Sequence, residues 1–173
     1  HLSIRRQRQM CIRDRIYTDG TLSKTYEVVK GPGNMVIQDN KLYVASTYFG
    51  EDWSTNAGNS VIDLSNDKVK KNDLGHTNDY GADLVPINNT IYRSFKGGIA
   101  ALKPDLTADA SNTIGTITKT YAAAAFGEYI FLTQTDYQAP DTVYVYDRSG
   151  AEIQKYAVGA IPGSFAIFDK KVN

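Results

Sequence analysis

The residue types most able to bind a ligand gather in the segment 48–59 (YFGEDWSTNAGN). This segment begins with Tyr48 and contains Trp53, the only tryptophan of the chain, directly after Glu51 and Asp52. An aromatic ring can stack on a sugar ring while neighbouring carboxylates accept hydrogen bonds from its hydroxyl groups. We therefore predict that these four residues contact a ligand. The alternative is that Trp53 folds back over its own loop.

Two further polar segments, 75–80 (GHTNDY) and 135–141 (TDYQAPD), carry similar side chains. Their candidate ligand-binding residues are His76, Asp79, Tyr80, Asp136 and Tyr137. Binding residues concentrate on loops that a rigid scaffold positions. We expect the ligand to be a carbohydrate or another protein.

Catalytic and metal sites are not predicted from these segments. Glu51 and Asp52 could act as an acid and a base only if their surroundings separated their pKa values, and adjacent loop carboxylates are usually both solvated. His76 and Asp79 have no Gly-x-Ser-x-Gly nucleophile motif beside them to complete a hydrolase triad. Zinc sites use about three or four His, Cys or carboxylate ligands, and the chain has two histidines and one cysteine. We expect no catalytic residue, no metal and no cofactor.

Aspartates also occur in the turns that follow predicted strands, at Asp63, Asp67 and Asp147. Hard oxygen ligands of this kind could bind Ca²⁺. The spacing does not match an EF-hand loop, however, and an aspartate in a turn commonly accepts a hydrogen bond from the backbone two residues later. We expect these carboxylates to hold turns.

A repeated strand pattern positions the candidate segments. The stretch 31–42 (GPGNMVIQDNKL) is similar to 160–172 (AIPGSFAIFDKKV), and two copies fit between them. In each copy an apolar run, a two-residue polar turn and a run rich in Tyr, Val and Ile follow one another, which indicates a β-hairpin. The expected turns are Asp39-Asn40, Asn88-Asn89 and Gly127-Glu128, and the expected equivalent positions after them are Leu42, Ile91 and Tyr129.

Third and fourth strands complete each copy of the repeat. The third strands are expected at 60–64, 98–102 and 142–147, and the fourth at 69–72, 116–118 and 152–156. Residues 108–113 (ADASNT) are expected to form a polar loop. No segment has the apolar spacing and caps of a helix. A period of about 40–45 residues is that of a four-stranded propeller blade.

The motifs of the repeat are Pro-Gly before an inner strand, Lys-Leu-Tyr-Val after a hairpin, and Val-Tyr-Asp followed by Ser-Gly. Over residues 16–173 this pattern resembles the NHL and YVTN-type β-propellers, and more loosely the large-ring propeller repeats of secreted Bacteroidetes proteins. It departs from the NHL pattern in uneven blade lengths and in lacking a Gly-rich start of the blade at Tyr121. The resemblance implies that ligands bind the loops between second and third strands and between successive blades.

The expected fold class is therefore all-β: an incomplete β-propeller of four-stranded antiparallel blades. Three full blades are expected at 31–75, 76–119 and 120–157, with partial blades at 16–30 and 158–173. Propellers usually close with about 4–8 blades. We expect a fragment of a longer protein, whose remaining blades are its first partners.

The first fifteen residues, HLSIRRQRQMCIRDR, differ from the rest of the chain, because they contain five arginines and the only cysteine, Cys11. They lack the apolar core of a targeting peptide. They resemble translated sequencing-adapter sequence of the kind found in metagenomic reading frames, and a basic arm is the alternative. We exclude residues 1–15 from the fold as an artefactual or disordered segment and take 16–173 as the partial propeller domain.

Composition narrows the function. The chain has 173 residues and a formal net charge of zero, but residues 16–173 alone are net acidic and lack a basic stripe, which disfavours nucleic acid. No apolar run approaches the roughly 18 residues of a membrane-spanning helix. Without Cys11 the chain has no cysteine, which suits a periplasmic, secreted or cell-surface bacterial protein. We expect a non-catalytic binding or scaffold module; the alternative is part of a propeller hydrolase or lactonase whose catalytic residues lie mostly in missing blades.

Overall fold

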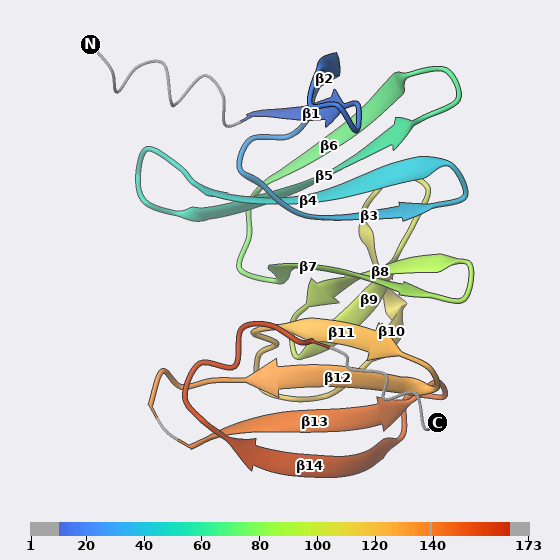
Figure 1. Cartoon of the computed structure of the whole chain (residues 1–173). Coiled ribbons are helices and arrows are strands. Elements are labelled where there is room, and N and C mark those ends of the chain that lie inside the picture. The colour runs from blue at the N-terminus through green and yellow to red at the C-terminus, as the bar shows by residue number, and fades with distance from the viewer. Residues whose placement is uncertain (1–10, 139, 167–173) are drawn as a thin grey trace.

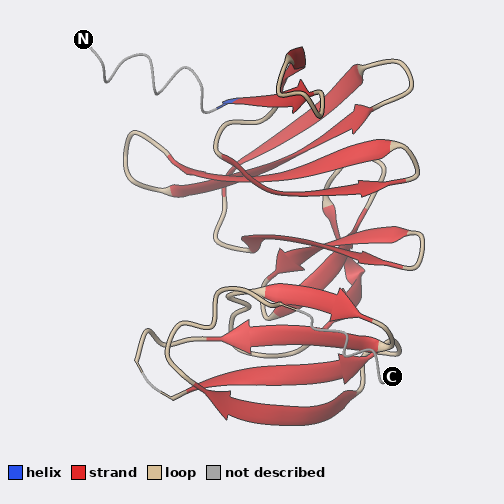
Figure 2. Cartoon of the chain, in the orientation of Figure 1, coloured by secondary structure: helices blue, strands red, loops and turns tan. Residues whose placement is uncertain are grey.

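The computed structural model describes residues 11–138 and 140–166, and these residues form fourteen β-strands and no α-helix (Figure 1, Figure 2). The strands make one two-stranded hairpin and three four-stranded antiparallel sheets. The expectation of an all-β chain built from repeated four-stranded units is confirmed. Within the described ranges no helix is long and apolar enough to cross a membrane.

The strands follow one another in chain order. The N-terminal hairpin and sheet I contain β1 (Ile12–Ile16), β2 (Leu22–Glu27), β3 (Pro32–Gln38), β4 (Lys41–Phe49), β5 (Thr55–Asp63) and β6 (Lys68–His76). Sheet II contains β7 (Tyr80–Ile87), β8 (Thr90–Phe95), β9 (Gly98–Leu102) and β10 (Ala108–Ile114). Sheet III contains β11 (Ala123–Phe126), β12 (Tyr129–Gln134), β13 (Asp141–Asp147) and β14 (Glu152–Val158).

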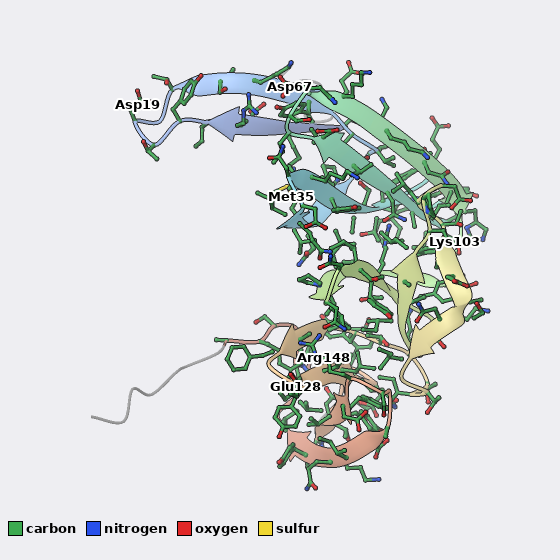
Figure 3. The ribbon with its side chains drawn as sticks, turned by 90° about the vertical axis from the view of Figure 1, so that its right-hand side faces the viewer. Asp19, Met35, Asp67, Lys103, Glu128 and Arg148 are labelled. Atoms are coloured by element: carbon green, nitrogen blue, oxygen red, sulfur yellow. The ribbon has the colours of Figure 1, made fainter. Side chains whose placement is uncertain are left out.

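The sheets are arranged one after another along an arc, with the first strand of each sheet on the inner side (Figure 3). These inner strands meet one another, since β7 contacts both β3 and β11. Within each sheet the strand order is the chain order, so the fourth strand forms the outer edge. This arrangement is consistent with propeller-like blades.

The predicted hairpin turns are confirmed by backbone geometry. Asp39 and Asn40 have φ values of 49° and 58°, and Asn88 and Gly127 have 51° and 55°. Asn, Asp and Gly tolerate this left-handed region better than other residues. Each turn leaves only two residues between its strands, so the pairing register of the inner hairpin is fixed.

The register corrects the predicted alignment of the third copy by one residue. Gln38 pairs with Lys41, and Phe126 pairs with Tyr129, so Tyr129 is equivalent to Lys41 rather than to Leu42. Ile130, which is fully buried, therefore takes the place of Leu42, whereas Tyr129 is half exposed. The error arose because Gly127, the first residue of its turn, was aligned with the second residue of the turn in sheet I.

The fourth strand of sheet II also differs from the prediction. It is β10, formed by the ADASNT segment expected to be a loop, while residues 116–118 are not in a strand. β10 lies at the sheet edge, with most of its side chains exposed and an irregular register opposite β9. An edge strand forms main-chain hydrogen bonds on one side only, and its side chains can be polar on both faces. β10 therefore lacks the alternation of apolar and polar residues by which a strand is recognised in a sequence.

At both ends of the described chain the strands differ from those predicted. Residues 12–15, which the sequence analysis excluded from the fold, lie in β1 and pair with β2. Strand pairing uses main-chain groups, so the unusual composition of this segment does not prevent it. Residues 161–166, expected to begin a partial blade, are not in a strand, and the rest of that expected strand lies outside the described residues.

Each sheet has two packing faces: a near face toward the preceding sheet and a far face toward the following one. Val44 and Ile62 on the near face of sheet I pack against Tyr26 and Val28 beside the N-terminal hairpin. The far face of sheet I meets Leu84 and Ile91 of sheet II, and the far face of sheet II meets Ile130 and Leu132 of sheet III. Because side chains alternate along a strand, one sheet supplies both interfaces.

The interface between sheets I and II contains a buried arginine. Arg93 on β8 is fully buried, and its guanidinium donates to the Gly58 and Ser46 carbonyl oxygens and to Asn59 Oδ1 in sheet I, the last two at 2.8 and 2.6 Å. Within its own sheet, Nε donates to Gly81 O at 3.0 Å. Burial lowers the pKa of Arg93 to about 10, so it stays charged at neutral pH.

The interface between sheets II and III has apolar side chains at the positions equivalent to Arg93 and Asn59. By the register of the inner hairpins, Arg93 is equivalent to Leu132, and Asn59 is equivalent to Ile99. Ile99 and Leu132 are both fully buried in the cluster between sheets II and III. The polar pair Asn59–Arg93 at one interface thus stands where the other has an aliphatic pair.

We predict that Arg93→Leu destabilises the chain by about 3 kcal/mol, because it leaves Asn59 and several carbonyl oxygens without their donor. The double change Asn59→Ile with Arg93→Leu reproduces the apolar pair of the neighbouring interface and should recover part of that loss, because Asn59 is no longer buried without its donor while the carbonyl oxygens still are. Urea unfolding measures both. Arg148→Leu, at the β13–β14 turn, is the control: its half-buried guanidinium bonds only the single carbonyl oxygen of Gly127, so its loss should cost clearly less, about 1 kcal/mol. Equal stability of wild type and Arg93→Leu would contradict the role assigned to Arg93.

Candidate functional site

The connections that carry the predicted ligand-binding residues lie on one face of the molecule. The β4–β5, β6–β7 and β12–β13 connections all occur at the left-hand side of Figure 1. Antiparallel strands in chain order place every second connection on the same side, so three segments far apart in the sequence share this face. We call it the loop face. In sheet II the equivalent β8–β9 connection is only the turn Lys96-Gly97.

Trp53 projects from the β4–β5 loop with 81% of its surface exposed. Its ring has one aromatic neighbour, Phe49, at a centroid distance of 6.4 Å and a tilt of 50°. Phe49 is itself 63% exposed. The alternative that Trp53 folds back to cover its loop is therefore wrong. Phe49 was missed by sequence analysis, although its place at the end of a Tyr-rich strand beside Gly50 was a usable signal.

Hydrogen bonds inside the β4–β5 loop fix the backbone that carries Trp53. Gly50 N donates to Ser54 O at 2.8 Å, Trp53 N donates to Gly50 O at 3.1 Å, and Ser54 N donates to Asp52 Oδ1 at 3.0 Å. Trp53 has a φ of 62°, a region that a non-glycine residue enters at a cost. The hydrogen bonds offset this cost and point the indole outward.

The polar residues near Trp53 differ in their hydrogen bonds and in their exposure to solvent. Hydrogen bonds from Ser54, together with the nearby His76, lower the pKa of Asp52. Glu51 is exposed. His76 Nδ1 lies 3.0 Å from Thr55 O, at the base of the same loop. Glu51 and Asp52 are thus part of the Trp53 loop, and His76 lies at its base.

Tyr48 is held to its own sheet. Its hydroxyl donates to both carboxylate oxygens of Asp73, at 2.8 and 2.9 Å, and the Lys30 ammonium lies 5.4 Å from its ring centroid. Burial, followed by Asp73, raises the pKa of Tyr48 to about 12. Tyr48 therefore supports the loop rather than extending from it.

A second exposed aromatic pair lies on the β12–β13 loop. Tyr137 is 67% exposed and packs edge to face on Tyr121 at a centroid distance of 6.0 Å. Like Trp53, Tyr137 has a positive φ, of 67°. Its N–H donates to Thr135 Oγ1 at 2.9 Å, and Asp136 Oδ1 accepts from Gln138 N at 2.8 Å. Tyr121 was not predicted as part of this site.

Asp79 and Tyr80 lie apart from the exposed aromatics. Tyr80 is half-buried, its ring lies edge to face with Phe95 at 5.1 Å and beneath the Arg93 guanidinium at 5.2 Å, and its hydroxyl accepts from Ala108 N at 2.9 Å. Asp79 lies 3.9 Å from Lys96 Nζ. Both residues thus contact the β8–β9 side of sheet II.

The turn aspartates behave as predicted at Asp63 and Asp147. Each accepts hydrogen bonds from the N–H and the hydroxyl of the serine two residues later, and these bonds lower the pKa of both carboxyls. Asp67 differs, since it accepts from Tyr26 and Lys24. Across 11–138 and 140–166, no three His, Cys, Asp or Glu side chains are grouped as a metal site would require.

The loop face therefore presents two separate pairs of exposed rings, Phe49–Trp53 and Tyr121–Tyr137, each on a backbone fixed by short-range hydrogen bonds. Such rings can stack on a flat apolar surface of a ligand. No protein-family model matches the chain, and no curated protein matches it.

Asp141 connects the Tyr137 loop to the segment after β14. Its carboxylate accepts from Thr135 Oγ1 at 2.7 Å, Asp136 N at 3.3 Å and Ile161 N at 2.6 Å. The hydrogen bond from Thr135 is the largest cause of the lowered pKa of Asp141. The side chain is nearly inaccessible, so it holds the loop from beneath.

We predict that the Tyr137 loop loosens in acid. Because the folded-state pKa of Asp141 lies below its ordinary value of 3.8, the stabilisation is complete above that value and is lost as the pH falls through the folded-state pKa. Backbone ¹⁵N relaxation of residues 135–138 should show no change from pH 6 down to about 3.8, and this loosening only as the pH is lowered further. Asp141→Asn should show it already at pH 6, whereas Asp136→Asn should not. A loop equally ordered in all three proteins at pH 6 would refute this role of Asp141.

Proposed function

We propose that this chain is part of a β-propeller-like scaffold that binds carbohydrate, without catalysis, through the loop face. The supporting observation is that the second-to-third-strand connections of sheets I and III each carry an exposed aromatic residue at positive φ, Trp53 and Tyr137. Residues held in strained backbone conformations cluster at active and ligand-binding sites. Exposed carboxylates near Trp53 can accept hydrogen bonds from sugar hydroxyls.

The propeller-like architecture is supported by an aromatic residue at the same far-face position of each sheet. Tyr43 of sheet I packs against sheet II, and the equivalent Tyr92 of sheet II packs against sheet III. The equivalent residue in sheet III is Phe131, whose ring lies 5.8 Å from Phe165. Phe165 therefore contacts sheet III as Leu84 contacts sheet I.

We propose that a further sheet of the same kind covers the far face of sheet III. This face presents Phe126, Tyr129 and Tyr156, each about half exposed. The pairing of Phe126 with Tyr129 and of Val143 with Tyr156 places them on one side. The equivalent far faces of sheets I and II are each covered by the following sheet. Large exposed apolar patches mark interaction surfaces.

If sheet III has a docking face, the chain should associate through it as concentration rises. We expect sedimentation velocity to show this association, and Phe126→Ser with Tyr156→Ser to reduce it strongly. Val69→Ser, on the outer strand of sheet I, is the control for loss of an exposed apolar side chain and should have little effect. Association unchanged by the double substitution would argue against docking at this face.

The alternative, a hydrolase or lactonase, needs acidic or metal-binding side chains on the inner strands. Among β3, β7 and β11 the only acidic residue is Asp83. Its carboxylate accepts from Ala123 N at 2.8 Å, and burial raises its pKa. Asp83 thus joins sheets II and III, and the described inner strands offer it no second carboxylate. We therefore favour binding, and with it an exported or cell-surface location.

The carbohydrate proposal predicts that a glycan array identifies an oligosaccharide that binds the intact chain. Binding should change the fluorescence of Trp53, which is the only tryptophan. Calorimetric titration of Trp53→Ala and Tyr137→Ala should show affinity losses of roughly threefold to tenfold each, as expected for a lost stacking contact.

Phe126→Ala is the matched control, because it removes an exposed aromatic ring away from the loop face. Equal loss in all three variants, or no glycan binding at all, would contradict the carbohydrate proposal. Binding of a protein that requires Trp53, with no glycan bound, would support the protein alternative instead.

A further inference from the structure

A groove of about 640 Å³ opens between sheets I and II. Its walls include the β7–β8 and β9–β10 turns, so it lies at the opposite side of the molecule from the loop face. Figure 3 places Lys103, at one edge of this groove, where the two sheets meet. The volume is within the range of about 300–1,000 Å³ of small-molecule sites. We call it the lysine groove.

The inner walls of the lysine groove are apolar. Tyr43 and Val61 line it from sheet I, and Ile91, Leu102 and Leu106 line it from sheet II. Ile91 and Leu106 are almost fully buried, so they form a floor rather than a rim. A flat or aliphatic group placed against these residues would be removed from water, which favours its binding.

Comparison with the next interface shows that the repeat does not require this opening. Tyr92, the equivalent of Tyr43, is 9% exposed and packs in the cluster between sheets II and III. Its hydroxyl donates to Asn112 Oδ1 at 3.0 Å. Tyr43 is only half-buried and borders the groove. The same sheet geometry is therefore closed at one interface and open at the other.

The charged groups around the groove are mostly cationic. Four lysines line it, Lys41, Lys68, Lys70 and Lys103, against the single carboxylate of Asp63. Asp63 faces Lys41 but already accepts hydrogen bonds from Ser65 and Asn66.

The lysines act only at longer range on nearby carboxylates: Lys103 contributes to the lowered pKa of Asp105 and of Asp109, after the hydrogen bonds that these carboxylates accept from Thr107 and Ser111. Within the described part of the chain, Lys41, Lys68 and Lys103 lie within ion-pair distance of no carboxylate. Lys70 donates to Pro104 O at 2.7 Å, which holds its ammonium at the groove. Clefts lined by one sign of charge concentrate ligands of the opposite sign.

We propose that the lysine groove binds a small organic anion with an apolar body, such as an aromatic or aliphatic sulfonate or carboxylate. The apolar part lies against Tyr43 and Ile91, and the anionic group lies at the rim between Lys41 and Lys103. This site is independent of carbohydrate binding at the loop face, because different residues, at the opposite ends of the strands, form it.

The test compares two dyes that differ in a sulfonate: 1-anilinonaphthalene-8-sulfonate and the neutral N-phenyl-1-naphthylamine. Fluorescence titration of the full chain should show one saturable sulfonate dye per chain and much weaker binding of the neutral dye. Lys41→Gln with Lys103→Gln should weaken sulfonate binding by about tenfold, the loss expected for a hydrogen bond to a charged group.

Two matched variants separate this site from other surfaces. Lys119→Gln with Lys155→Gln removes the same charge outside the groove and should leave binding unchanged. Phe126→Ser with Tyr156→Ser removes exposed apolar rings of sheet III and should also leave it unchanged. The proposal is overturned if the neutral dye binds equally well, if the two lysine pairs have equal effects, or if the sheet III variant abolishes binding. Thermal unfolding checks that each variant is folded.

Discussion

The guanidinium of Arg93 determines how sheets I and II meet. A charge without contact with water must satisfy its donors, and here the acceptors are carbonyl oxygens and an amide of sheet I. These bonds are directional, so they fix the distance and the rotation between the sheets more narrowly than apolar packing does. The stack of Tyr80 beneath the guanidinium holds it from its own side. The relative placement of sheets I and II, and with it the geometry of the loop face and of the lysine groove, depends on these contacts of Arg93.

The alternation of side chains along each strand gives every sheet two interfaces, and the antiparallel order sends the connections to two opposite sides of the molecule. Connections after the second and fourth strands reach the loop face, and the turns after the first and third strands reach the other side. The loop face has long connections with exposed rings in sheets I and III. The opposite side has short turns, where lysines gather around the opening between sheets I and II.

The sequence was most informative where local chemistry decides the structure. The Asp39-Asn40 type of turn and the Tyr- and Val-rich strands after it predicted the inner hairpins, because turn conformation and β-propensity are local. β10 was missed because an edge strand can be polar on both faces. The hydrogen bonds of Tyr80 with Ala108 and of Tyr48 with Asp73 could not be predicted, since these partners lie three and two strands further along the chain. Trp53 was predicted to lie in a loop between strands, as it does. Its exposure depends on hydrogen bonds within that loop, which cannot be read from the sequence.

The contrast between the polar pair Asn59–Arg93 and the aliphatic pair Ile99–Leu132 gives the two interfaces different heat capacities. Burying aliphatic surface contributes a large positive heat capacity of unfolding, whereas burying polar groups contributes with the opposite sign. The joint between sheets II and III therefore weakens on cooling, while the joint held by Arg93 has a flatter temperature dependence. Cooling therefore weakens the aliphatic joint more than the joint that Arg93 holds.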